Sequence, residues 1–220
     1  MAITIDGTTG IASVNGSAGS PSVRGTDANS GVVYGSDTIK FSTGGVERAT
    51  IDNSGLKSTG HILQVVQTVK TDTDSTDVGP GNEADLGISC AITPKSASNK
   101  ILIDCNLMIA SSTSFGTYLY LVRGSTKILL GDVAGNRTRA SKYITTYTES
   151  GGGNTYKVGD VNIKYLDSPT YSVGETITYK IQAAGWNSSK VYINRCHFDN
   201  DAATYDGRGT STIILMEVAG

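Results

Sequence analysis

The chain has 220 residues, a formal net charge of −2 and a pI of about 5.6, which gives no bulk electrostatic reason to bind nucleic acid or an anionic membrane. It contains 27 Gly, 27 Thr and 24 Ser but only 3 Phe and 1 Trp, a composition that favours strands and turns over helices. No apolar run approaches the roughly 20 residues of a membrane span, and residues 1–7 lack the features of a secretion signal. We therefore expect folding in a cytoplasm, without nucleic-acid partners or membrane insertion.

Residues 1–60 contain few apolar side chains, and these are scattered among turn residues. Short extended segments at 28–35, 37–45 and 47–55 each end in Gly, Asn or Asp, the residue types that tolerate tight turns. A single chain of this composition cannot offset the entropy lost when its backbone becomes ordered. This segment is therefore either disordered or ordered by identical neighbouring chains.

The composition changes near Gly60, so we divide the chain into an N-terminal segment, 1–60, and a C-terminal domain, 61–220. In the second part apolar and polar residues alternate with period two, as in Ile101, Ile103 and Cys105, which predicts sheets with one buried face. The many short strands and Gly-rich turns predict an all-β antiparallel β-sandwich that is jelly-roll-like. The predicted strands cover 62–71, 84–93, 100–110, 117–123, 126–131, 141–148, 157–166, 175–183, 190–198 and 210–218.

The last predicted strand is apolar on both faces, because residues 213–216 read Ile-Ile-Leu-Met without interruption. A strand of this kind needs cover on both faces, either from a partner subunit or from a loop of the same chain. The three cysteines, Cys90, Cys105 and Cys196, lack the paired spacing of metal and redox motifs, which predicts buried reduced thiols.

A search for catalytic chemistry finds no convincing site, so we expect neither enzymatic activity nor a cofactor. His197 lies near Asp199 at a predicted strand end and is interpreted as a surface imidazole. His61 is a weak metal candidate, since three copies can meet on a threefold axis. The acidic residues around Asp74 and Asp199 do not have calcium-loop spacing and are interpreted as solvated turns.

Three predicted loops carry side chains suited to a surface ligand. Aromatic rings pack on sugar C–H groups while neighbouring amides bond hydroxyls, and arginines pair with phosphates. Each loop also has an ordinary alternative, either an aromatic ring folded over the sandwich end or a solvated turn. The candidates are Trp186 and Asn187; Tyr205, Asp206 and Arg208; and Arg137 and Arg139, with Lys142 beside them.

The chain resembles tail-fibre and related virion proteins of aquatic bacteriophages, cyanophages among them. In the N-terminal part the resemblance rests on residues 3–11 (ITIDGTTGI), 31–34 (GVVY), 41–45 (FSTGG) and 48–55 (RATIDNSG). In the C-terminal part it rests on residues 65–73, 92–95, 99–102, 121–125, 165–169 (YLDSP), 191–195 and 211–218 (STIILMEV). Related fibres often have a long shaft, whereas only about 25 residues of shaft-like repeat precede the C-terminal domain here.

This resemblance implies a homotrimer with a short N-terminal trimeric β shaft or anchor and a C-terminal knob. It implies a virion location after assembly in the host cytoplasm, and docking to other tail or baseplate proteins through the N-terminal segment. The expected function is a tail fibre that mediates adhesion to a bacterial host through noncovalent binding of a surface glycan or protein. The alternatives are a structural capsid-fibre or tail-tip adaptor without a receptor role, and a glycan-degrading spike.

Overall fold

The structure is a computed structural model that describes residues 4–6, 10–12, 15–53, 55–112, 116–145, 156–185 and 187–220. The described residues contain strands and turns but no helix, and thus no helix that could cross a membrane. The chain divides into two compact units, Met1–Leu63 with Val218–Gly220, and Gln64–Glu217. The predicted all-β class is confirmed.

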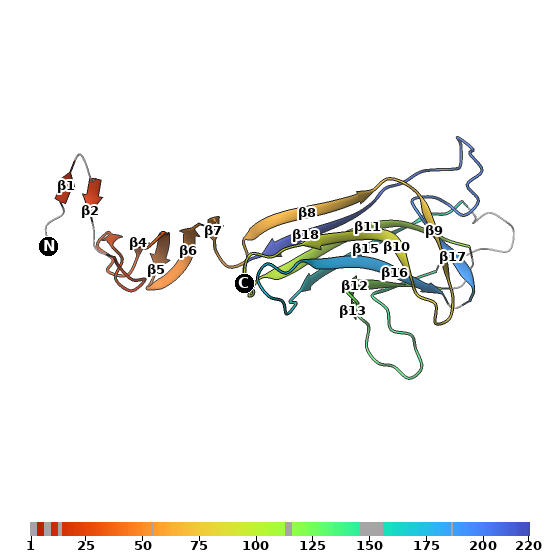
Figure 1. Cartoon of the computed structure of the whole chain (residues 1–220), viewed down its shortest axis with the longest axis horizontal. Helices are drawn as coiled ribbons and strands as arrows, with labels where there is room; N and C mark the ends of the chain where they lie inside the picture. The colour runs from red at the N-terminus through yellow and green to blue at the C-terminus, as the bar shows by residue number, and fades with distance from the viewer. Residues whose placement is uncertain are drawn as a thin grey trace. The chain divides into compact units, whose positions relative to one another are not determined.

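The N-terminal unit contains a two-stranded hairpin and a five-stranded antiparallel meander (Figure 1). Strands β4, β5 and β6 overlap the short extended segments predicted at 28–35, 37–45 and 47–55. Asp37, Gly44 and Gly45 supply the positive φ angles of the turns between them. The strands are β1 (Thr4–Asp6), β2 (Gly10–Ala12), β3 (Val23–Arg24), β4 (Gly31–Gly35), β5 (Thr38–Thr43), β6 (Val46–Asp52) and β7 (Gly55–Lys57).

The C-terminal unit is a sandwich of two antiparallel sheets, labelled in Figure 1. One sheet contains β8 (Ile62–Lys70), β18 (Ser211–Val218), β11 (Lys100–Ser111), β15 (Gly159–Asp167), β17 (Ser189–Ile193) and β9 (Asp74–Val78). The other contains β10 (Ala84–Ile92), β16 (Ile177–Gly185), β12 (Thr117–Arg123), β13 (Thr126–Ile128) and β14 (Lys142–Ile144).

The strand order is that of a jelly roll. When β9, β14 and β17 are set aside, eight strands remain, and we count them from first to eighth along the chain. One sheet then has the order β8, β18, β11 and β15, which are the first, eighth, third and sixth strands. The other sheet has the order β10, β16, β12 and β13, which are the second, seventh, fourth and fifth strands along the chain. This interleaving of two Greek keys confirms the jelly-roll-like sandwich expected from the strand pattern.

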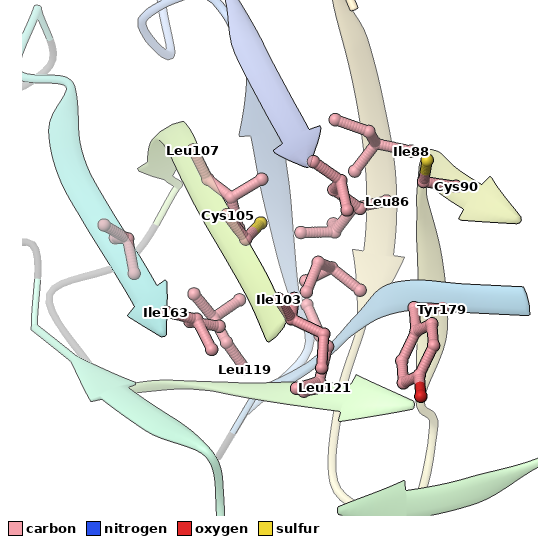
Figure 2. Packing of buried hydrophobic residues seen from close by; sticks show 14 of the residues in the cluster. Leu86, Ile88, Cys90, Ile103, Cys105, Leu107, Leu119, Leu121, Ile163 and Tyr179 are labelled. Atoms are coloured by element: carbon pink, nitrogen blue, oxygen red, sulfur yellow. The ribbon is translucent and has the colours of Figure 1, made fainter. Parts of the chain in front are cut away.

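The core fills the space between the two sheets, and Figure 2 shows part of it. Ile101, Ile103 and Cys105 of β11 are fully buried, as their alternation predicts, and so are Tyr179 and Ile181 of β16. Side chains from both sheets interdigitate there, as they do in other sandwich cores. All three cysteines are buried and free, which confirms the prediction of reduced thiols.

Two buried carboxylates tie the strands together. Asp167, at the end of β15, accepts hydrogen bonds from Arg123 Nη1 to both its oxygens (2.8 and 2.7 Å) and from the Tyr179 hydroxyl (2.7 Å). Glu217 of β18 is fully buried and accepts bonds from Gln64 Nε2 (2.6 Å) and from the backbone amide of Lys95 (2.6 Å). Because buried charges need such partners, Asp167 links its strand to β12 and β16 of the other sheet, whereas Glu217 links β18 to β8 and to the loop after β10.

Three strand predictions require correction. Asp74 and Asp77 lie on β9 and not in a solvated turn, because pairing with β17 orders this polar edge segment. The strand predicted for 126–131 ends at Ile128, since Leu129 adopts φ +54°. The strand predicted for 190–198 ends at Ile193, because Asn194 turns the chain with φ +62°.

The last strand, β18, buries alternate residues only. Ile213 and Leu215 are fully buried in the core, while Ile214 and Met216 on the opposite face are half-buried. The described part of the chain therefore does not fully cover the second apolar face. Val65 and Val69 of the neighbouring strand β8 are 57% and 50% exposed.

Candidate functional site

The long connection between β17 and β18, residues 194–210, begins at a buried polar junction. The Asn194 side-chain amide donates to the carbonyls of Lys70 and Asp72 (both 2.8 Å), and its oxygen accepts from the Ser211 hydroxyl (2.7 Å). The backbone amide of Gly209 also donates to the Asn194 carbonyl (3.1 Å). These bonds hold the two ends of the connection together, so the intervening residues project as a closed loop.

Asp206 holds the interior of this loop together. Its carboxylate accepts bonds from the Cys196 thiol (2.9 Å) and from the backbone amides of Asn200 (2.5 Å) and Ala202 (3.3 Å). The thiol bond is the main reason that the pKa of Asp206 is lowered, while burial and the same bond raise the pKa of Cys196. Asp206, predicted as a receptor contact, is partly exposed, and its carboxylate is used in hydrogen bonds within the loop.

Five rings form a continuous cluster across the loop, which we call the aromatic cluster. His197 stacks on Tyr192 with ring centroids 5.2 Å apart, and Phe198 lies 5.1 Å from His197. Tyr156 packs edge-on against Phe198 (5.7 Å) and Tyr205 (4.6 Å). Tyr192 is buried, whereas Phe198 and Tyr205 are 48% and 53% exposed. The cluster thus has a buried base and an exposed outer end.

Charged side chains surround this cluster. The Arg195 guanidinium lies 4.3 Å from the centre of the Tyr192 ring and 3.5 Å from Asp199, which also pairs with Arg208. Burial, together with the charge of Arg195, lowers the pKa of His197. The imidazole is therefore a half-buried stacking group, which corrects the interpretation of His197 as a surface residue.

The second predicted loop leads into β17 at Ser189, whereas the loop with the aromatic cluster follows the last residue of this strand, Ile193. Trp186 lies outside the described residues. Asn187 is exposed, and its side-chain oxygen accepts a bond from the Ser188 amide (3.0 Å). Ser188 borders an open hollow together with Gly79, Lys190 and Tyr192. Tyr192 therefore connects this hollow to the aromatic cluster.

The third predicted loop, between β13 and β14, lies elsewhere. Arg139 Nε donates to the Gly131 carbonyl (2.5 Å) and Arg137 Nη1 donates to the Ala134 carbonyl (3.2 Å), so both guanidiniums help to close their own loop. Lys142 borders a separate hollow beside Asn162 and Lys164 of β15. The predicted basic cluster therefore forms a different surface from the aromatic cluster.

The weak metal candidate, His61, has an exposed side chain in the N-terminal unit. Within the described ranges, no group of three or more His, Cys, Asp or Glu side chains is arranged to hold a metal ion. The possibility of His61 copies meeting on an axis stays a prediction.

Sequence reasoning missed Phe198 and Tyr156 as members of the site. Phe198 was placed in a strand, and Tyr156 lies 42 residues earlier in the chain. Only the fold brings these two rings within 5.7 Å of each other. The cluster of Tyr192, His197 and Phe198 within seven residues of the sequence was the one available signal.

No family model matches the chain, and no curated protein matches it. Among solved structures, infectious bursal disease virus of the Gx strain is 16% identical with a TM-score of 0.33, over 76% of this chain and 45% of that chain. T=1 particles derived from infectious bursal virus are 15% identical with a TM-score of 0.34, over 83% of this chain and 46% of that one. The chain thus spans less than half the length of these structures, and likenesses this low assign no function.

Proposed function

We propose that the chain is a bacteriophage virion structural protein that works as a homotrimeric tail fibre, adhering to the bacterial host surface through noncovalent contacts with a glycan. The observation that carries this proposal is the two-part build of the chain. The C-terminal jelly roll has a large core of its own, whereas Val33 is the only buried apolar residue in strands β3–β7. A self-sufficient knob joined to a segment that needs other chains is what a short fibre requires.

The aromatic cluster supports the choice of a glycan as ligand. Phe198 and Tyr205 present ring surfaces to solvent, and sugar C–H groups pack favourably on such rings. Arg208 is exposed beside them and has N–H donors for hydroxyl or anionic groups of a sugar. The bonds to Asp206 and Asn194 hold the loop in one conformation, so little ordering entropy is lost on binding.

The half-buried face of β18 supports assembly of several copies. Ile214 and Met216 belong to β18, which neighbours the strand of Val65 and Val69, β8, and none of these apolar side chains is fully covered in the described single chain. Contact with other copies would remove this surface from water. In this proposal the N-terminal segment also docks to tail or baseplate proteins, and the fibre assembles in the host cytoplasm before joining the virion.

The function is tested by binding of the purified chain to polysaccharide isolated from the host envelope. Phe198→Ala and Tyr205→Ala should each weaken binding about 3- to 10-fold, the equivalent of roughly 0.7–1.4 kcal/mol for one lost ring contact. Tyr143→Ala is the matched control, because Tyr143 is another exposed tyrosine (58%) on a different sheet. This control should bind like the wild-type chain.

Two results would contradict the proposal. Failure to bind any host cell or envelope fraction, combined with incorporation into virions, would indicate a structural adaptor. Release of reducing sugar ends from the polysaccharide would indicate a glycan-degrading enzyme.

A further inference from the structure

The five-stranded sheet of the N-terminal unit has one apolar face. Directly paired residues in antiparallel strands point to the same side of a sheet. One cross-strand row on this face contains Val23, Val32, Phe41 and Ala49, in register from β3 to β6. A second row contains Tyr34, Ile39, Ile51 and Leu56, in register from β4 to β7.

This apolar face is not covered within the described chain. The exposed fractions of its six large side chains lie between 38% for Ile39 and 48% for Val23. A meander of short strands with an open apolar face is not stable by itself in water, because too little of its surface is buried. Something else must therefore cover the face when the segment is ordered.

The opposite face of the same sheet carries charged side chains that form ion pairs. Lys40, next to Ile39 on β5, pairs with Glu47 (2.8 Å), and Lys57, next to Leu56, pairs with Asp52 (2.7 Å). The charges thus lie on one side of the sheet, together with the buried Val33 of β4, and the two apolar rows lie on the other side. This separation indicates which side faces a partner and which side faces solvent.

We propose that the two rows are the surface through which copies of this chain associate, three to an assembly, with the charged face outward. The number of copies, three, rests on the proposed function, whereas the choice of this face rests on the observed register of the strands. We name a second and a third copy as the occupants because the two rows contain no charged residue, so identical rows meet without like-charge repulsion.

The exposed area of the two rows is large for a single chain. Side chains of this size exposed by about two-fifths present roughly 70 Å² each, so the two rows offer on the order of 500 Å² per copy. Three copies would then bury about 1,500 Å² in total, or about 500 Å² for each pair of copies, so the two rows supply only part of a standard two-partner interface of about 1,600 Å². The same patch on a solitary chain would lie at the upper end of what monomers expose.

The test compares thiol protection on the two faces in the full-length chain. Ile39→Cys and Lys40→Cys place a thiol on adjacent residues of β5 that point to opposite sides. The native cysteines are buried, so they contribute little background labelling by a maleimide. We expect Ile39→Cys to be labelled at least about tenfold more slowly than Lys40→Cys, with both variants sedimenting as three chains. Leu56→Cys, at the other edge of the apolar face, should be protected like Ile39→Cys.

The outcomes separate this inference from the proposed function. If wild-type chains form trimers but Ile39→Cys and Leu56→Cys are both labelled as fast as Lys40→Cys, the association face is wrong while the trimeric fibre stands. If the wild-type chain sediments as single copies or pairs, the threefold assembly is overturned and the fibre proposal with it. Protection of both apolar positions in a three-chain assembly supports both.

Discussion

At the scale of single residues, Asp206 determines whether the aromatic cluster is held in place. Replacing it with alanine removes the acceptor for the Cys196 thiol and for the amides of Asn200 and Ala202. We expect these two amides to exchange hydrogen faster in Asp206→Ala, while the melting temperature of the jelly roll changes little, because the core is untouched. Thr204→Ala, at an exposed position in the same loop, serves as the control. Unchanged exchange would show that the loop is held by other contacts.

His197 makes the same loop sensitive to pH. Burial lowers its pKa in the folded chain, so between the folded and unfolded values the unfolded state binds more protons. Stability is therefore greatest above the unfolded pKa of about 6.5 and decreases as the pH falls through the folded value. We expect the loop to become less protected from proteases from about pH 7.5 to about pH 5.5 in the wild-type chain but not in His197→Phe. His61→Ala should keep the dependence, and its loss there would contradict the assignment.

At the scale of elements, the junction of β12, β15 and β16 depends on Arg123 and Asp167. Arg123→Met leaves a carboxylate that is almost fully buried with only the Tyr179 hydroxyl as a described donor, which should cost about 3–5 kcal/mol of unfolding free energy. The triple variant Arg123→Met, Asp167→Leu, Tyr179→Phe should recover most of this loss, because no buried polar group is left unpaired. Chemical denaturation measures both variants. If the triple variant were as unstable as the single one, the network would stabilise the fold by more than the neutralisation of a buried charge.

The strands of the jelly roll were largely predictable from the sequence, because period-two alternation directly marks the buried face. Strand β12 was predicted with its exact limits, and the alternation in β11 and β16 identified core residues correctly. Strand β9 was not predictable in the same way, since Asp74 and Asp77 read as a turn and are ordered by β17, more than 100 residues later. The aromatic cluster was not predicted for the same reason: Tyr156 and Phe198 are distant in the sequence, and only the fold brings them into contact.

The sequence alone also could not predict which residues share the apolar face of the N-terminal sheet. The composition of residues 1–60 showed that apolar residues are few, and it predicted either disorder or ordering by identical neighbouring chains. It did not show that Val32 pairs with Phe41 or that Ile39 pairs with Ile51, because register depends on the bulge next to Phe41 and on the turns. Once the register is known, the scattered apolar residues become two aligned rows.

At the scale of the whole molecule, three knobs on one fibre should bind a surface far more tightly than one knob. Phe41→Asp introduces a charge into the proposed association face, and like charges from three copies would then meet. We expect this variant to sediment as single chains, and its apparent affinity for immobilised host polysaccharide to fall about 10²- to 10⁴-fold through loss of multivalency. Its affinity for a short soluble oligosaccharide should not change, because the aromatic cluster belongs to the separate C-terminal unit.

The comparison of immobilised and soluble ligand decides between two explanations of weaker binding. Loss of avidity affects only the immobilised ligand, whereas damage to the binding site lowers the affinity for both. Phe198→Ala should show the second pattern, with a similar fold-change on both ligands, in chains that still assemble. If Phe41→Asp instead weakened the soluble ligand as much as the surface, the sugar site would depend on the N-terminal sheet, and adhesion by independent knobs would be contradicted.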